Sequence, residues 1–92
     1  MNITTSTTIV NMKYERADVN CGRGSIYGNP YRIGIDGTRD EVCDKYKEYF
    51  YKKILNPTFR NKVLLLKSKK LGCWCKPLRC HLETIKEYLD NN

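Results

Sequence analysis

Three cysteines and the single histidine of the chain lie close together near its C-terminus. The stretch that carries them, residues 71–83, reads LGCWCKPLRCHLE and also holds the only tryptophan and two basic side chains. Thiols and imidazoles bind zinc and act as nucleophile and base, while basic side chains at a helix start bind anions. Metal binding, thiol catalysis and anion binding are therefore the three chemistries to weigh.

A zinc site would use Cys73, Cys75, Cys80 and His81. Zinc takes four ligands in a tetrahedron, usually from two pairs whose spacing lets the chain wrap the metal. The paired C-x-x-C spacing is absent, and the adjacent residues 80 and 81 reach one ion together with difficulty. His81 and Glu83 have the spacing seen in zinc deaminases, but the Pro-Cys-x-x-Cys of those enzymes is missing. We therefore interpret the thiols as small core residues and expect no cofactor.

Cys80 is the candidate nucleophile for thiol chemistry, with His81 and Glu83 as further candidate catalytic residues. We expect Cys80 at the start of the last helix, where the helix dipole, Lys76 and Arg79 would lower its pKa. Catalysis also needs an aligned base, and successive side chains on a helix do not face each other. The alternative is that Cys80 caps the helix or packs in the core.

The anion-binding interpretation joins this helix start to a glycine-rich loop. Lys76, Arg79 and the first amides of the last helix would form a cradle for phosphate. The loop, residues 21–30, reads CGRGSIYGNP. Its glycines let the backbone approach a phosphate, and Arg23 can bind oxyanions with two hydrogen bonds. Such a loop, without a strict glycine spacing, is otherwise only a flexible connection.

The strands that must position these residues follow from the hydrophobic pattern. Residues 9–14 begin with β-branched side chains and are predicted to form the first strand. Residues 71–75 are apolar on both alternating faces, which is typical of a strand in the middle of a sheet. Glycines and an Asn-Pro pair predict irregular structure over residues 15–30, and a short strand is expected over residues 31–35.

Three helices are predicted between and after these strands. Thr38 and Glu41 have the spacing of a capping box, so a helix begins there and runs to the Asn-Pro at residues 56–57. A second helix covers residues 58–67, and the last follows Leu82. The apolar positions expected to face the core are Val42, Tyr46, Tyr49, Phe50, Ile54, Phe59, Val63, Leu66, Leu82, Ile85, Tyr88 and Leu89.

This order of elements indicates one α/β domain over residues 1–92, with residues 1–8 as a polar lead-in. We expect a small single-layer sheet with parallel central strands flanked by helices, Rossmann-like. Ligands of such sheets bind beyond the carboxyl ends of the strands, where Asn11 would fix a sugar or base and Tyr27 or Trp74 would stack. The expected ligand-binding residues are Asn11, Lys13, Arg23, Gly24, Ser25, Tyr27, Asn29, Pro30, Trp74, Lys76, Arg79, Cys80 and His81.

Charge and cysteine usage indicate the partner and the compartment. The net charge is +7, and residues 52–79 carry nine basic side chains and no acidic one. Such a stretch attracts nucleic acid or other anions, although a solvated lysine-rich face has the same composition. An odd number of cysteines without a leader segment indicates free thiols in a reducing compartment. No apolar run approaches the roughly 20 residues that span a bilayer, so a soluble, cytoplasmic protein is expected.

Several short motifs resemble one known family. They are Val10-Asn11, GRGS with GNP in the glycine-rich loop, IG with DGTR before the first helix, and GCWCKP with CH in the C-terminal stretch. Over nearly the whole chain these motifs resemble the phage and bacterial family known as domain of unknown function 4326. Tyr27 stands where that family usually has tryptophan, and Leu82 where glycine commonly follows the histidine. The resemblance implies a small α/β domain, a phage or mobile-element setting in a bacterial host, and no established reaction.

Three functions compete at this stage. The leading hypothesis is a small phage-type binding protein that holds a nucleotide or nucleotide-derived signalling molecule and sequesters a host immune signal without cleaving it. Its pocket would be completed in a homo-oligomer. One alternative is a nucleic-acid-binding module that uses the basic residues 52–79. The other is an enzyme that processes a nucleotide or nucleoside with Cys80, His81 or Glu83.

Overall fold

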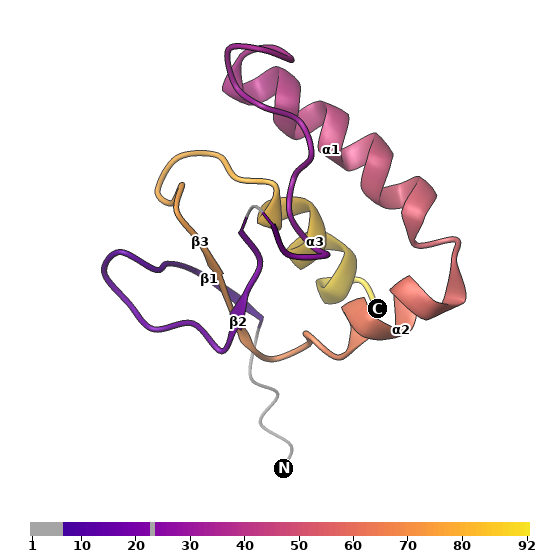
Figure 1. Ribbon diagram of the computed structural model, residues 1–92. Helices are drawn as coiled ribbons and strands as arrows, with labels where there is room; N and C mark the ends of the chain where they lie inside the picture. Colours follow the sequence, from indigo (N-terminus) through magenta and orange to yellow (C-terminus); the bar gives the residue numbers. More distant parts are fainter. Residues whose placement is uncertain (1–6, 23) are drawn as a thin grey trace.

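The computed structural model describes residues 7–22 and 24–92, which form a three-stranded sheet and three helices (Figure 1). The elements are β1 (Thr8–Asn11), β2 (Val19–Asn20), α1 (Arg39–Lys53), α2 (Pro57–Leu64), β3 (Lys70–Cys73) and α3 (Leu82–Asp90). The strand order is β1-β3-β2, and β3 pairs in parallel with both neighbours. The predicted α/β class is confirmed, but the Rossmann-like detail is not.

The central strand β3 is buried on both faces. Leu71 lies opposite Ile9 of β1 and Val19 of β2, and it is fully buried in the core that the helices cover. Cys73 points to the same side, because side chains alternate along a strand. The helices lie together on this face of the sheet (Figure 1).

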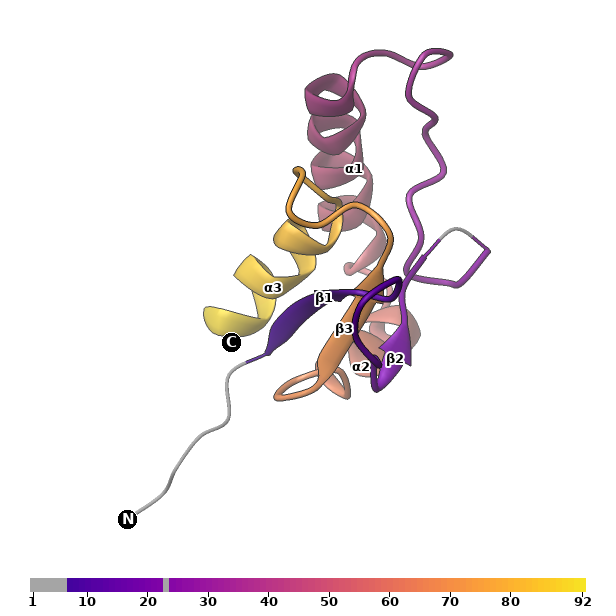
Figure 2. The same ribbon diagram turned by 90° about the vertical axis from the view of Figure 1, so that its left-hand side faces the viewer.

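The connection over residues 12–18 covers the other face of β3 (Figure 2). A crossover between parallel strands ordinarily needs about a dozen residues or more, usually as a helix. This shorter connection lies flat on β3 because Gly72 has no side chain. A Cβ at that position would come within 2.6 Å of both Ala17 Cβ and Met12 Cγ. At the end of the connection, the Lys70 amide donates to Asp18 Oδ2 at 2.8 Å.

The helices begin where capping residues place them. The Glu41 amide donates to Thr38 Oγ1 at 3.2 Å, and the Thr38 amide donates to Glu41 Oε1 at 2.9 Å, which completes the predicted capping box. At the start of α2, Asn56 Oδ1 accepts from the amides of the first turn, and Pro57 needs no acceptor. The predicted core positions are buried, except that Tyr49 and Tyr88 are half-buried at its margin.

Two details of the predicted strands are wrong. Residues 31–35 form no strand, because Ile33 makes only an isolated bridge to Gly37, within a turn that is closed by the Gly34 amide donating to the Gly37 carbonyl at 2.8 Å. The irregular segment over residues 15–30 contains β2, whose two residues are too few to show an alternating pattern.

We predict that Gly72→Ala destabilises the fold, because the added methyl group would meet the connection over residues 12–18. Overpacking of this kind costs about 1–3 kcal/mol of unfolding free energy, to be measured by urea denaturation. Ala17→Gly in the same chain removes one of the two clashing groups. The double variant should therefore recover part of the loss, and equal stability of the single and double variants would contradict the predicted contact.

Candidate functional site

A cavity of about 170 Å³ opens at the edge of the sheet where the strands end. Gly22 follows β2 and Trp74 follows β3, and both line this cavity together with the start of α1. Three buried lining residues, Cys73, Cys80 and His81, come from the motif that the sequence singled out. The structure thus brings the glycine-rich loop and the C-terminal motif together, as predicted from the direction of the strands.

The histidine ring is held in one orientation by its two nitrogens. His81 Nε2 lies 2.8 Å from the Cys21 carbonyl oxygen. Because a carbonyl only accepts, Nε2 carries the proton of the neutral ring. The other nitrogen, Nδ1, then faces Cys80 Sγ at 3.5 Å. The edge of the ring packs against Tyr46, with the ring centroids 4.9 Å apart.

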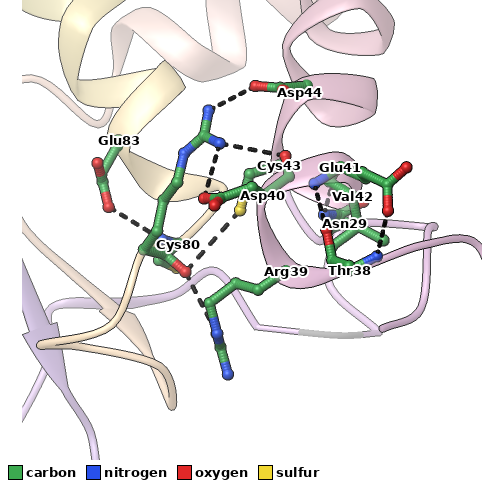
Figure 3. A network of polar contacts seen from close by, with 11 residues as sticks. Asn29, Thr38, Arg39, Asp40, Glu41, Val42, Cys43, Asp44, Cys80 and Glu83 are labelled. Atoms are coloured by element: carbon green, nitrogen blue, oxygen red, sulfur yellow. Dashed lines mark hydrogen bonds and ion pairs between the residues drawn. The ribbon is translucent and has the colours of Figure 1, made fainter. Parts of the chain in front are cut away.

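The argument that neighbouring helical side chains point apart therefore does not apply to Cys80 and His81. Helix α3 begins at Leu82, so Cys80 precedes the helix and its side chain is free of the helical geometry that separates neighbours. Glu83 Oε2 accepts from the Cys80 amide at 2.9 Å, which gives this carboxylate a capping contact at the helix start (Figure 3).

The predicted lowering of the Cys80 pKa is also wrong. A hydrogen bond with Cys73 and burial together raise the pKa of Cys80 far above the ordinary thiol value. The same hydrogen bond lowers the pKa of Cys73 to about 6, and the amides of Cys75 and Lys76 and the Lys76 charge act in the same direction. Burial and the neighbouring Cys73 raise the pKa of Cys21 to about 12. These contacts therefore favour the thiolate form at Cys73 and disfavour it at Cys80.

Arg79 is engaged by carboxylates of α1. Its Nη1 lies 3.1 Å from Asp40 Oδ1 and its Nη2 lies 2.7 Å from Asp44 Oδ1 (Figure 3). These hydrogen bonds raise the Arg79 pKa above its ordinary value. An anion would have to compete with both aspartates, so the phosphate-binding role of Arg79 stays a prediction that this geometry does not favour.

Arg39 is a cationic residue of the cavity that was not among the predicted ligand-binding residues. It is the first residue of α1, lines the cavity and donates from Nη1 to the Arg79 carbonyl at 3.2 Å. A guanidinium has five N–H donors, so this contact leaves others for a ligand. The signal was present in the DGTR motif, where an arginine directly follows the capping threonine.

Asn11, Lys13 and Lys76 tie the end of β1 to the loop after β3. Asn11 Nδ2 donates to the Lys76 carbonyl at 2.7 Å and to the Trp74 carbonyl at 3.4 Å, while its Oδ1 accepts from the Lys13 amide at 2.9 Å. Lys76 Nζ donates to the Ile9 carbonyl at 2.8 Å. These contacts hold the loop in place, and the predicted roles of the three side chains in ligand binding stay predictions.

The structure divides the predicted residues of the glycine-rich loop between two places. Asn29 lines the cavity, and its Nδ2 donates to the Val42 carbonyl of α1 at 3.2 Å. Gly24, Ser25 and Pro30 line a second hollow of about 290 Å³, which Asn29 also lines. Their role as ligand residues stays a prediction.

The remaining loop residues are Tyr27 and Arg23. The Tyr27 ring packs 6.3 Å from the ring of Phe59, and its hydroxyl donates to the Lys62 carbonyl at 3.4 Å. This places the Tyr27 ring against the helical core, and its stacking on a ligand stays a prediction. Arg23 lies outside the described residues.

Metal ions and membranes are two further partners to consider for the described residues. Over residues 7–22 and 24–92, no group of three or more His, Cys, Asp or Glu side chains is arranged to hold a metal ion. In the same part of the chain, no helix combines the length and apolar character needed to cross a membrane.

The basic residues 52–79 are spread over the end of α1, α2, β3 and the following loop. Lys70 within them pairs with Glu15 at 3.2 Å, and the binding of nucleic acid by this stretch stays a prediction.

A three-stranded parallel sheet, covered by helices and carrying a thiol-lined cavity at its carboxyl edge, defines a small α/β domain. The chain belongs to the family described as Domain of unknown function (DUF4326), which matches residues 5–91. This membership confirms the resemblance inferred from the motifs.

Two viral relatives support a phage-type setting. An uncharacterized 12.4 kDa protein from the nrdA–td intergenic region of Enterobacteria phage T4 is 34% identical over 79 residues, covering 84% of this chain and 71% of the phage protein. An uncharacterized protein of Acanthamoeba polyphaga mimivirus is 37% identical over 51 residues, covering 55% of this chain and 36% of its own. No solved structure matches the chain.

We predict that Arg79→Gln lowers the unfolding free energy by about 1 kcal/mol at low salt, because the loop loses its attachment to α1. The partly exposed ion pairs should be screened in 1 M salt, so the loss should shrink there. Lys47→Gln is the matched control, since it removes an exposed pair with Glu87 whose atoms are 3.7 Å apart. Equal effects of the two substitutions in urea titrations would show that Arg79 does not hold the loop.

Stability should rise with pH between about 6 and about 8.5. In this window the folded chain has lost the Cys73 proton, while the unfolded chain, with an ordinary thiol pKa of about 8.5, still binds it. The contribution is lost as the pH falls through 6. Urea midpoints across this range should show the rise in the natural chain and lose it in Cys73→Ala. Cys43→Ala is the control, because burial raises the pKa of Cys43; if it flattened the profile equally, the assignment to Cys73 would fail.

Proposed function

We propose that this protein binds a planar, nucleotide-like small molecule in the cavity at the carboxyl edge of its sheet. The observation that carries the proposal is the exposure of Trp74, which is 62% accessible although it lines the cavity. An exposed indole leaves apolar surface in water, and its face can stack on any base. Trp74 also lies beside Gly22, where a Cβ would be 3.6 Å from the indole ring.

The size of the cavity limits the group that enters it. Binding pockets for whole small molecules are about 300–1,000 Å³, and this cavity is about 170 Å³. A single ring system therefore fits inside, while a sugar and phosphate would remain at the opening. Arg39 lines the same cavity and has further N–H donors for a phosphate.

The family and its phage T4 relative support a use during infection. A protein that binds a nucleotide-derived signal without changing it would sequester that signal from the host. A second copy of the chain would cover the part of the ligand that extends from the opening, so the proposal includes a homo-oligomer.

The single tryptophan makes this binding directly measurable. Nucleoside monophosphates, cyclic dinucleotides and ADP-ribose should be titrated by Trp74 fluorescence and by calorimetry. At least one should quench the indole and release heat. Trp74→Ala should weaken binding by about 1–3 kcal/mol through loss of stacking, and Trp74→Phe should lose less. Absence of heat and of quenching with every member of the panel would refute the proposal.

A pair of arginine variants separates this pocket from general attraction of nucleic acid. Arg39→Gln should weaken phosphate-bearing ligands by about tenfold, whereas Arg60→Gln, exposed on α2, should not. If Arg60→Gln weakens binding equally and affinity falls steeply with salt, the nucleic-acid alternative is correct. A mass spectrum of the ligand after incubation tests the enzyme alternative, since an unchanged mass means binding without turnover.

A further inference from the structure

The second hollow, of about 290 Å³, is lined by the glycine-rich loop and by the C-terminal half of α1. Residues 29–33 form a wall between this hollow and the cavity at the sheet edge. Tyr31 and Ile33 line the cavity, Pro30 and Arg32 line the hollow, and Asn29 lines both. Its volume is close to the lower limit of about 300 Å³ for ligand pockets, so the hollow has room for a ligand group of its own.

Lys53, in the last turn of α1, brings a half-buried positive charge to the second hollow. Its Nζ lies 4.5 Å from the centroid of the Phe59 ring and 5.2 Å from that of Tyr49. It donates to the Tyr49 hydroxyl at 2.9 Å and to the Ile26 carbonyl at 3.4 Å. Among the described residues, no carboxylate oxygen lies within 4.0 Å of this ammonium. A partly buried charge without an opposite charge is costly, so an anion in the hollow would stabilise it.

Arg32 supplies a second cation from the dividing wall. Its amide donates to Asp36 Oδ2 at 2.8 Å, which fixes the backbone of this turn. The guanidinium itself is exposed, and no carboxylate oxygen of residues 7–22 and 24–92 lies within 4.0 Å of it. The described residues that line the hollow include no Asp and no Glu. Two positive charges therefore line one space without a compensating carboxylate.

The glycine-rich loop adds an open stretch of main chain to the second hollow. The Ser25 hydroxyl and amide both donate to the Gly22 carbonyl, at 2.8 and 3.1 Å, and the Gly28 amide donates to the Ser25 carbonyl at 3.1 Å. These bonds fix the loop as successive turns. Gly24 has a φ of 95°, and a Cβ there would meet nothing within 4 Å. The backbone at Gly24 can therefore be approached closely by a ligand in the hollow.

We propose that the second hollow binds a phosphate group, which is held by Arg32, Lys53 and the main chain of the glycine-rich loop. The two cations match the charge of about −1.5 to −2 that a phosphate monoester carries at pH 7. The guanidinium can bind two of its oxygens, and the ammonium binds as a point charge. The sequence paired this loop with Lys76 and Arg79, whereas the described cations that line its hollow are Arg32 and Lys53. This site is separate from the proposed binding cavity and does not depend on it.

Proton–nitrogen NMR spectra of the full chain test this site, with inorganic phosphate as the probe and chloride used to hold the ionic strength constant. The amides of Gly24, Ser25 and Gly28 should shift and reach saturation. They should move more than the indole N–H of Trp74, which reports on the cavity. Acetate carries a single charge and should bind about tenfold more weakly. Loop amides that ignore phosphate, or that respond equally to acetate, would overturn the proposal.

Substitutions at the two cations give the second readout. Arg32→Gln should weaken phosphate binding by about tenfold, because a charged contact with two hydrogen bonds is lost. Lys53→Met should weaken it similarly while its apolar side chain still covers the Phe59 ring. Arg16→Gln is the matched control, since Arg16 is exposed and does not line the hollow.

Unchanged affinity in Arg32→Gln, or an equal loss in Arg16→Gln, would show general attraction of anions and exclude the site. Because Arg32 is exposed, this variant decides the question even if Lys53→Met fails to fold.

Adenosine 5′-monophosphate distinguishes free phosphate from the phosphate of a nucleotide. If it binds more tightly than phosphate and shifts the loop amides and the Trp74 indole together, the hollow holds the phosphate of a nucleotide. If it shifts the loop amides alone, with the affinity of phosphate, the phosphate group is recognised by itself.

The two proposals fail in different ways. If no nucleotide quenches Trp74 but phosphate shifts the loop amides in a manner that depends on Arg32, the phosphate site stands and the proposed function is wrong. If a nucleotide quenches Trp74 while the loop amides ignore phosphate, the cavity is a binding site and the phosphate site is refuted.

Discussion

The structure depends on covering both faces of one short strand. A central parallel strand exposes neither face to water, so β3 needs helices on one side and other chain on the opposite side. Leu71 supplies the apolar contact to the helices, and Gly72 leaves the space in which the connection over residues 12–18 lies. Because side chains alternate along the strand, Cys73 at its end is buried in the core, and the side chain of the next residue, Trp74, is exposed.

Local signals in the sequence were sufficient for much of this arrangement. The capping box at Thr38 and the helical spacing of apolar residues depend on neighbours within one or two turns, and both appear in the structure. The buried strand was recognisable because its residues are apolar on both faces. β2 could not be recognised in this way, because two residues are too few to show an alternating pattern. Its position depends only on its pairing with β3.

The details of the cavity depend on contacts between residues that are far apart in the chain. The spacing of residues within a motif does not predict such contacts. Arg79 was expected to bind anions, yet Asp40 and Asp44 reach it from α1. Cys80 and His81 would point apart if both were helical, but α3 starts only at Leu82 and the two side chains are in contact. The pKa is raised at Cys21 and Cys80 and lowered at Cys73, because burial acts on all three thiols and more hydrogen bonds reach the Cys73 sulfur.

The side chain of Asn11 has an effect beyond fastening a loop. The Trp74 carbonyl that it holds belongs to the same trans peptide group as the Cys75 N–H, so the two point in opposite directions. The next peptide is held in the same way, since the Leu78 amide donates to the Cys75 carbonyl at 2.8 Å. Both N–H groups consequently point towards the Cys73 sulfur. An amide at the end of β1 thereby orients two peptide dipoles and helps to set the charge of a sulfur that it does not touch.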